Sequence, residues 1–283
     1  MYKRSEGFFK GYQDINLFFQ KWEKSDAKGT IIITHGHGEH SESYSRLIEG
    51  FADQPWTFYA WDIRGHGRSE GRRGYVAEFD DYCKDFKIFV EMVKKEDKVK
   101  KGPVVLLCHS MGGLIELKTL IQHPELTADA IAVSSPLLGL TVQVPALKAH
   151  GAKLLNRLLP QVTLGNELIN SMLTRDLEVI REFEHDALRH SRVSPGAFLG
   201  FLESFAFVEP RAKEIKTPAI FMISDSDPVV SSKAARHFYD HLGSEKKEIY
   251  IYPGAKHEVF NDIIRQTVYA DLKKFLAPFL ESK

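Results

Sequence analysis

Short runs of apolar, aromatic and β-branched residues recur along the chain, and segments with a helical pattern separate most of them. The runs begin at Ile15, Thr30, Thr57, Pro103, Ala130, Pro218 and Glu248. Most of the later runs are continuously apolar, which is typical of strands covered on both faces. Apolar residues at helical spacing occupy Phe79–Val99, Leu114–His123, Lys233–Leu242 and Asp262–Phe279. This order predicts an α/β fold with a mostly parallel sheet, an antiparallel start and helices between the strands.

One interval interrupts this alternation. From Leu137 to about Arg211 there is no convincing strand pattern, and leucines at helical spacing are interleaved with Lys148, Lys153 and Arg157. We therefore expect a helical cap over residues 137–211, inserted into a core formed by residues 1–136 and 212–283. Amphipathic helices mostly cover cores, but an apolar lid with a basic rim is also suited to a lipid surface.

Composition narrows the class of protein. The chain has 283 residues, 38 Lys and Arg against 38 Asp and Glu, and no long basic block, so no nucleic-acid partner is indicated. Cys83 and Cys108 fit a reducing compartment better than a disulfide framework. No stretch has the length of a signal peptide's apolar region or of a membrane span. We expect a soluble, cytoplasmic protein, with peripheral membrane contact through the cap left open.

A serine stands where the apolar run from Pro103 ends and a helix begins, in the sequence His109-Ser110-Met111-Gly112-Gly113. A tight strand-to-helix turn strains its central residue and exposes that residue's side chain. The following N–H lies at a helix N-terminus, which favours negative charge. Although a helix N-cap is the simpler role for a serine here, the turn predicts that Ser110 is a nucleophile.

A serine nucleophile needs a base that an acid orients, and in this architecture both follow the serine along the chain. The run from Pro218 ends with Asp225 and Asp227, and the run from Glu248 is followed by His257. We expect His257 to be the base. Asp227 is the preferred acid, because it lies further into the loop and precedes Pro228, which restrains it to an extended conformation.

The oxyanion of the reaction needs backbone donors. His35-Gly36-His37-Gly38 follows the run from Thr30, and its two glycines allow the backbone to approach a substrate closely. We assign the oxyanion hole to the backbone N–H groups of His37 and Met111. The imidazole of His37 has no role in this interpretation.

Taken together, the motifs resemble the α/β-hydrolase family, and within it the monoacylglycerol lipase and lysophospholipase branch. The matching segments are His35–His40, Asp62–Ser69, His109–Gly113, Ser134–Leu138 and the loops that hold Asp227 and His257. The resemblance covers nearly the whole chain. It implies an eight-stranded hydrolase sheet with a cap after the sixth strand, the same three catalytic residues, and monoacylglycerols or lysophospholipids as substrates. Cys108 departs from the family, which usually has glycine there.

Other activities remain open at this stage. His35, His37 and His40 with Glu39 are similar to a zinc motif of metallohydrolases, which leaves Ser110, Asp227 and His257 without a role. A binding protein on a hydrolase scaffold is a second alternative. A general carboxylesterase, or a hydrolase of thioester or peptide bonds, is a third. The main hypothesis is a serine hydrolase of lipid esters that forms an acyl-enzyme and needs no metal or organic cofactor.

Overall fold

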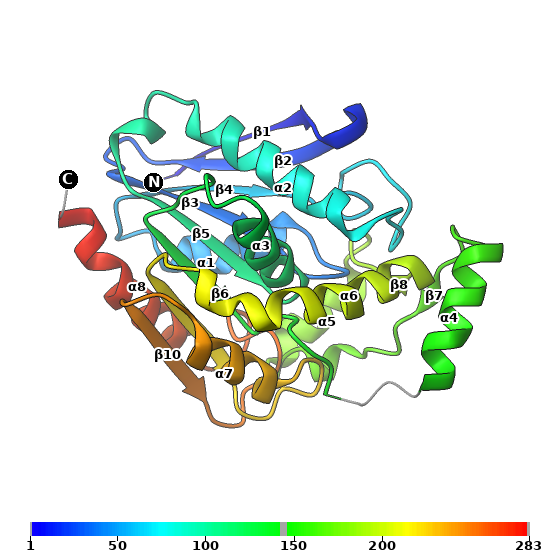
Figure 1. Cartoon of the computed structure of the whole chain (residues 1–283). Coiled ribbons are helices and arrows are strands. Elements are labelled where there is room, and N and C mark those ends of the chain that lie inside the picture. The colour runs from blue at the N-terminus through cyan, green and yellow to red at the C-terminus, as the bar shows by residue number, and fades with distance from the viewer. Residues whose placement is uncertain (1, 142–145, 282–283) are drawn as a thin grey trace.

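The computed structural model describes residues 2–141 and 146–281, and for 146–149 only the backbone is described. An eight-stranded sheet in the order β1-β2-β4-β3-β5-β6-β9-β10 forms its centre (Figure 1). The strands are β1 (Lys3–Lys10), β2 (Asn16–Glu23), β3 (Gly29–Thr34), β4 (Trp56–Trp61), β5 (Val104–His109), β6 (Ala130–Ser134), β9 (Ala219–Ser224) and β10 (Lys247–Tyr252). Strands β1, β2 and β4 pair antiparallel, and from β4 to β10 all neighbours are parallel. This is the α/β-hydrolase sheet that the sequence predicts.

The central strands are apolar on both faces because helices cover both. Every residue of β3, β4, β5, β6 and β9 is buried. One hydrophobic cluster joins one face of the sheet to α2 (Phe79–Lys94), α3 (Met111–Gln122), α6 (Pro195–Val208) and α7 (Ser232–His241). A second cluster joins the other face to α1 (Ser45–Gly50) and α8 (Arg265–Glu281). Burial of these side chains is the main contribution to the stability of this part of the fold.

The segment between β6 and β9 is predominantly helical. It contains α4 (Ala146–Leu158), α5 (Leu177–His185), α6 and two short 3₁₀ helices, η4 (Asn170–Met172) and η5 (Glu209–Glu214). Three further 3₁₀ helices lie elsewhere: η1 (Tyr12–Asp14), η2 (Ser41–Tyr44) and η3 (Val99–Lys101). Helix α4 stands at the edge of the molecule, beyond α6 (Figure 1). Part of the leucine-rich stretch expected to be helical, residues 142–145, lies outside the described residues.

Two details differ from the sequence-based expectation. The interval from 137 to 211 was expected to contain no strand, but β7 (Leu164–Gly165) and β8 (Arg192–Val193) form a two-residue antiparallel pair. So short a pair leaves no alternating pattern in the sequence. The first strand, β1, is missing from the seven apolar runs, because seven of its eight residues are exposed or only partly buried. An edge strand with a single buried side chain, here Phe9, carries little hydrophobic signal.

Parallel strands bring the loops that follow them to one edge of the sheet. Strands β3, β5 and β9 are parallel to one another through β6 and end at Thr34, His109 and Ser224, and β10 ends beside them at Tyr252. The loops with His37, Ser110, Asp227 and His257 therefore leave the sheet at its carboxyl edge, where open α/β sheets bind ligands.

Candidate active site

Ser110 occupies the sharp turn between β5 and α3. Its backbone has φ 52° and ψ −117°, a region that residues other than glycine rarely adopt. The N–H of Ser110 donates to the carbonyl of Ser134 (3.0 Å), and its own carbonyl accepts from Gly113 and Leu137. Strain of this kind persists only where the surroundings hold the chain in place. Here a neighbouring strand and the first turn of a helix do so.

Small residues around the turn permit this geometry. A methyl group added at Gly112 would lie 2.3 Å from the carbonyl oxygen of Thr34, so only glycine fits there. Cys108 lies beneath the turn, fully buried, and its thiol approaches the carbonyl oxygen of Ala132 (3.7 Å). Gly113 faces it, and a side-chain carbon there would lie 3.8 Å from the sulfur. At 3.8 Å such a carbon would be in ordinary van der Waals contact with the sulfur, so cysteine fits beneath the turn without crowding α3.

The structure brings Ser110, His257 and Asp227 into one hydrogen-bonded chain. His257 Nε2 lies 2.9 Å from Ser110 Oγ, and His257 Nδ1 lies 2.7 Å from Asp227 Oδ2. All three side chains are buried, at 4–7% exposure. Since the carboxylate only accepts, the proton on neutral His257 resides on Nδ1, and Nε2 is free to accept from the serine hydroxyl.

Asp227 and His257 shift each other's pKa in the directions that favour an ion pair. Burial would lower the pKa of His257, but the charge of Asp227 and its hydrogen bond outweigh burial and raise this pKa above the ordinary value. Burial would raise the pKa of Asp227, but His257 and the N–H groups of Val229 and Val230 lower it. Those two N–H groups lie 2.8 and 3.0 Å from Asp227 Oδ1. Asp227 is thus held as an anion at neutral pH.

The neighbouring acid, Asp225, lies elsewhere. Its carboxylate accepts from the N–H of Gly254 (2.9 Å) and from the hydroxyl of Ser226, on the exposed side of the loop. Asp225 thus fixes the loop after β10 against the loop after β9 and does not contact His257 in the structure. Between the two acids that the sequence offers, the structure places Asp227 at the imidazole.

The loop after β3 passes directly beside Ser110. A side-chain carbon added at Gly36 would lie 3.0 Å from Ser110 Cβ, so the glycine allows this close approach. The N–H of Gly36 donates to Glu39 Oε1 (2.5 Å), which also accepts from the Tyr44 hydroxyl (3.1 Å). Met111 begins α3, so its N–H is one of the unpaired donors at the helix N-terminus. Glu39 therefore fixes the turn that precedes His37.

The three histidines of the possible zinc motif have separate partners. Since His35 Nε2 accepts from the N–H of Ile63 (3.0 Å), its Nδ1 donates to the carbonyl of Gly36 (2.7 Å). His40 Nε2 lies 2.7 Å from Asp186, and His37 Nε2 donates to the carbonyl of Arg192 (2.8 Å). No group of three or more His, Cys, Asp or Glu side chains in the described part of the chain is arranged to hold a metal ion. The geometry gives the zinc interpretation no support.

The imidazole of His37 has a structural place that the sequence did not indicate. Its Nε2 donates to the carbonyl of Arg192, the first residue of β8. Its ring packs edge-on against the rings of His66 and His190, with ring centroids 5.3 and 5.5 Å apart. Burial lowers the pKa of His37 to about 4, so the ring is neutral at neutral pH. The loop of the expected oxyanion hole is thereby tied to the inserted segment.

Two buried acids, Glu39 and Glu258, lie together beside the site, and the sequence analysis had named only Glu39, as part of the possible zinc motif. Glu258 accepts from Arg189 (2.6 Å), which comes from the inserted segment, and Glu39 lies close by. Burial opposes ionisation of Glu258, but the Arg189 charge lowers the pKa of Glu258 below the ordinary value. Burial and the charge of Glu258 raise the pKa of Glu39 to about 7. The adjacency of Glu258 to His257 was the one available signal, because a contact with Arg189 has no local pattern.

A second unexpected acid is Glu116, on the face of α3 that packs on the sheet. It is fully buried, and neither carboxyl oxygen has an N–H or O–H partner among the described residues. The Cys108 thiol is its one weak hydrogen-bonding neighbour, and burial raises the pKa of Glu116 well above the ordinary value. A lone charge would be very unfavourable here, so Glu116 is a neutral carboxylic acid at neutral pH.

The arrangement at the carboxyl edge is chemically capable of acyl transfer. It supplies a hydroxyl, a base that accepts its proton, an anion that orients the base, and backbone donors beside the hydroxyl.

Comparison with known proteins agrees with this geometry. A profile of the family described as serine aminopeptidase, S33, matches residues 25–264. The chain belongs to this family of serine hydrolases.

Individual relatives resemble the chain over most of its length. A monoacylglycerol lipase of Mycolicibacterium smegmatis is 28% identical and covers 98% of both chains. A monoglyceride lipase of Rattus norvegicus is 30% identical over 87% of this chain and 81% of its own. The crystal structure of a soluble variant of monoglyceride lipase from Saccharomyces cerevisiae, with a substrate analog, has a TM-score of 0.84 at 23% identity. It covers 99% of this chain and 94% of its own. That last similarity establishes the fold.

Proposed function

We propose that this S33-family hydrolase cleaves fatty acyl esters of glycerol, with Ser110 as nucleophile, His257 as base and Asp227 as the acid that orients it. The hydrogen-bonded chain from Asp227 through His257 to Ser110 is the observation that carries the proposal. The names of two relatives that cover most of the chain, a monoacylglycerol lipase and a monoglyceride lipase, support glycerol monoesters as the substrate class.

In the proposed reaction, Ser110 Oγ attacks the ester carbonyl while its proton moves to His257 Nε2. The oxyanion that forms accepts hydrogen bonds from the N–H groups of His37 and Met111, each such donor being worth about 3 kcal/mol of the barrier. The bond from carbon to the alcohol oxygen then breaks, and His257 returns the proton to the leaving alcohol. Water, activated by His257, releases the fatty acid from Ser110 in the same way.

A substrate panel tests the activity. Monoacylglycerols, lysophosphatidylcholine and simple esters, each with acyl chains from acetate to oleate, are given to the wild type and to Ser110→Ala. We expect the wild type to prefer the longer monoacylglycerols over acetate by about tenfold or more, since each buried methylene contributes about 0.8 kcal/mol. Ser110→Ala should fold normally and lose turnover. Retained turnover in that variant, or a strict preference for acetate, would overturn the proposal.

Peptide hydrolysis is the second candidate, because the family as a whole carries an aminopeptidase description. The same panel includes aminoacyl arylamides with a free α-amino group. We expect esters to be the better substrates, since the described residues around the site offer no unpaired carboxylate for an ammonium group. Glu258 is paired with Arg189, and Glu39 accepts from Gly36 and Tyr44. Faster turnover of the arylamides would assign the protein to the second candidate.

We also propose that residues 137–211 act as a cap that contacts the lipid surface. Among the described residues of this segment, six large apolar side chains are 55–66% exposed: Leu154, Leu158, Leu159, Leu164, Ile169 and Leu177. Lys153 and Arg157 are exposed beside the first of them on α4. An apolar surface with basic neighbours is the combination that binds an interface with anionic lipid. No helix in the described residues is long and apolar enough to span a bilayer, so contact would be peripheral.

Vesicle sedimentation tests the cap. We expect Leu154→Ser with Leu158→Ser to weaken binding to vesicles of phosphatidylcholine and phosphatidylglycerol by about tenfold or more. Phe8→Ser is the matched control, because Phe8 is 60% exposed but lies on β1, in the core sheet. Equal loss from both variants, or no loss from the leucine pair, would contradict a role of the cap in docking.

A further inference from the structure

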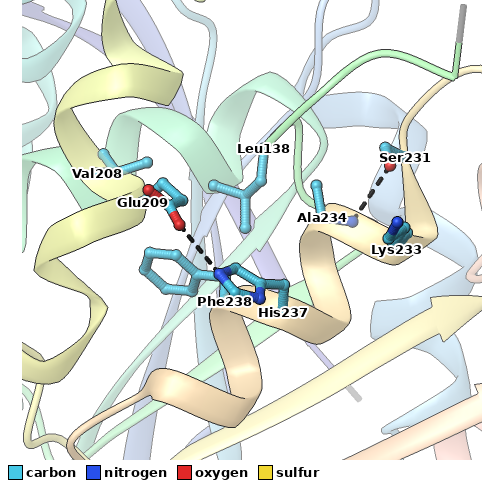
Figure 2. Close-up of a pocket in the computed structure, with 8 residues that line it drawn as sticks. All are labelled: Leu138, Val208, Glu209, Ser231, Lys233, Ala234, His237 and Phe238. Atoms are coloured by element: carbon cyan, nitrogen blue, oxygen red, sulfur yellow. Dashed lines mark hydrogen bonds and ion pairs between the residues drawn. The ribbon is translucent and has the colours of Figure 1, made fainter.

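A cavity lies apart from the hydrogen-bonded chain of Asp227, His257 and Ser110, between the end of α6 and the first turns of α7 (Figure 2). Its volume is about 270 Å³. The residues that line it are Leu138, Val208, Glu209, Ser231, Lys233, Ala234, His237 and Phe238. None of Ser110, His257 and Asp227 is among them, so the space belongs to a different site from the one described above.

The cavity has an apolar floor and a polar rim. The floor is formed by Leu138, Val208 and Phe238. These side chains are almost completely buried, with exposed fractions of 7%, 1% and 1%. At the rim, His237 Nε2 lies 3.0 Å from Glu209 Oε1, a pair that is visible in Figure 2. Lys233 is exposed, and its ammonium has no ion pair with any residue that the structure describes. An apolar space with one unmatched cation at its edge calls for a ligand that combines a hydrocarbon with an anion.

The size of the cavity restricts the hydrocarbon. Its volume lies just below the range of about 300–1,000 Å³ that is usual for sites that bind cofactors and drug-sized molecules. The apolar floor offers no buried polar group for orienting a sugar, a nucleotide or a peptide. A single unbranched chain needs only apolar walls, and each methylene placed there leaves water favourably.

We propose that this cavity binds a fatty-acid carboxylate, with the aliphatic chain on Leu138, Val208 and Phe238 and the carboxylate at Lys233. Such a molecule is the acid product of the function proposed above, and in this respect the inference rests on that function. The cavity would be a second product site, at which the acid binds without entering the space at Ser110.

The position of the cavity gives such a site access to the cap. Its wall residue Leu138 lies at the start of residues 137–211, shortly after β6, and Ser231 precedes α7. The two segments are joined, because the N–H of Ser231 donates to the carbonyl of Gly139 (2.9 Å) and Leu140 pairs with Val230. A bound acid would thus contact both the linker into the cap and the chain that follows Asp227.

Calorimetric titration with decanoate, below its micellar concentration, tests the proposal. The protein is used untreated and after Ser110 has been capped with a long-chain fluorophosphonate that fills the catalytic site. We expect decanoate to bind the capped protein. Ala234→Phe should weaken this binding about tenfold or more, because the new ring occupies the cavity. Lys233→Glu should weaken it about threefold or more through loss of the rim charge.

Matched controls separate the cavity from general effects. Ala270→Phe and Lys274→Glu make the same changes at exposed positions of α8, and we expect both to bind like the wild type. Decanol, which has the chain without the charge, should bind more weakly than decanoate and should be insensitive to Lys233→Glu. Binding that survives Ala234→Phe at wild-type strength, or that disappears when Ser110 is capped, would overturn the proposal.

Failure of the proposed function would be recognised separately. The effect of Ala234→Phe on decanoate binding can be measured whether or not the protein hydrolyses esters. The substrate panel, in turn, gives its result whether or not this cavity binds an acid. We expect Ala234→Phe to retain hydrolysis of monoacylglycerol within about twofold, because none of Ser110, His257 and Asp227 lines this cavity.

Discussion

Two buried carboxyl groups, Asp227 after β9 and Glu116 inside α3, differ in charge state because their surroundings differ. Asp227 faces the imidazole of His257 and accepts two backbone N–H groups, and its pKa is lowered in spite of burial. Glu116 has only the thiol of Cys108 near it, and burial raises its pKa. The same functional group is therefore an anion held against an imidazole at one place and a neutral packing group at the other.

The largest expected effect comes from neutralising the first acid. We expect Asp227→Asn to lower kcat/KM about 10⁴-fold, because an amide in this position favours the wrong tautomer of His257. Steady-state kinetics on a monoacylglycerol measures the change. Asp225→Asn is the matched control and should stay within about twofold, since Asp225 contacts the loop rather than the imidazole. A loss in kcat/KM of less than tenfold in Asp227→Asn would contradict the assignment of Asp227, rather than Asp225, as the acid that orients His257.

The second acid should affect stability rather than turnover. The folded-state pKa of Glu116 is raised, so the folded protein retains a proton that the unfolded chain releases above about pH 4.3. Wild-type stability is therefore lost as pH rises from there towards the folded-state pKa. Glu116→Gln avoids this loss, and its advantage in free energy of unfolding should grow by about 1.4 kcal/mol per pH unit over that window.

Urea unfolding at several pH values measures this advantage. Glu184→Gln, an exposed position on α5, is the control and should show no such dependence on pH. We expect kcat/KM of Glu116→Gln to remain within about threefold of the wild type, because Glu116 touches none of the three catalytic side chains. An advantage that is constant with pH would mean that Glu116 is already ionised in the folded protein.

The smallest change that we predict is in the dependence of kcat/KM on pH near neutrality. His257 acts as a base only when neutral, and Asp227 raises its pKa above 6.5. Activity should therefore fall about tenfold per pH unit below this pKa and level off above it. In Asp227→Asn the midpoint of the remaining activity should move to lower pH, because the carboxylate no longer stabilises the imidazolium. An unchanged midpoint would show that the two groups are not coupled.

The sequence predicts the features that are encoded by neighbouring residues along the chain. The buried strands are visible because both faces are apolar, as in Ile31, Ile32 and Ile33 of β3. The sharp turn at Ser110 is visible because serine and glycines occur between a strand and a helix, and the loops of Asp227 and His257 follow their strands. Strand β1 gives no such signal, because it is an exposed edge.

Contacts between distant segments had no sequence pattern. Arg189 meets Glu258 across 69 residues, and His37 meets Arg192 across 155. Glu116 is a different case, since a single acid in an apolar helix was readable in the sequence but its burial was not. Helix α3 is covered all round by the sheet and by α2 and α6, so even its polar position faces the interior. Only the packing of the other elements determines this.

We propose that Ser110 is made nucleophilic by His257 and Asp227. The most direct test is to treat the protein with a fluorophosphonate and to locate the modified residue by peptide mass spectrometry, in the wild type and in His257→Ala. We expect stoichiometric modification at Ser110 in the wild type, with a rate that follows the neutral form of His257, and modification slowed by orders of magnitude in His257→Ala. Modification of another residue, or equal rates in the two proteins, would contradict it.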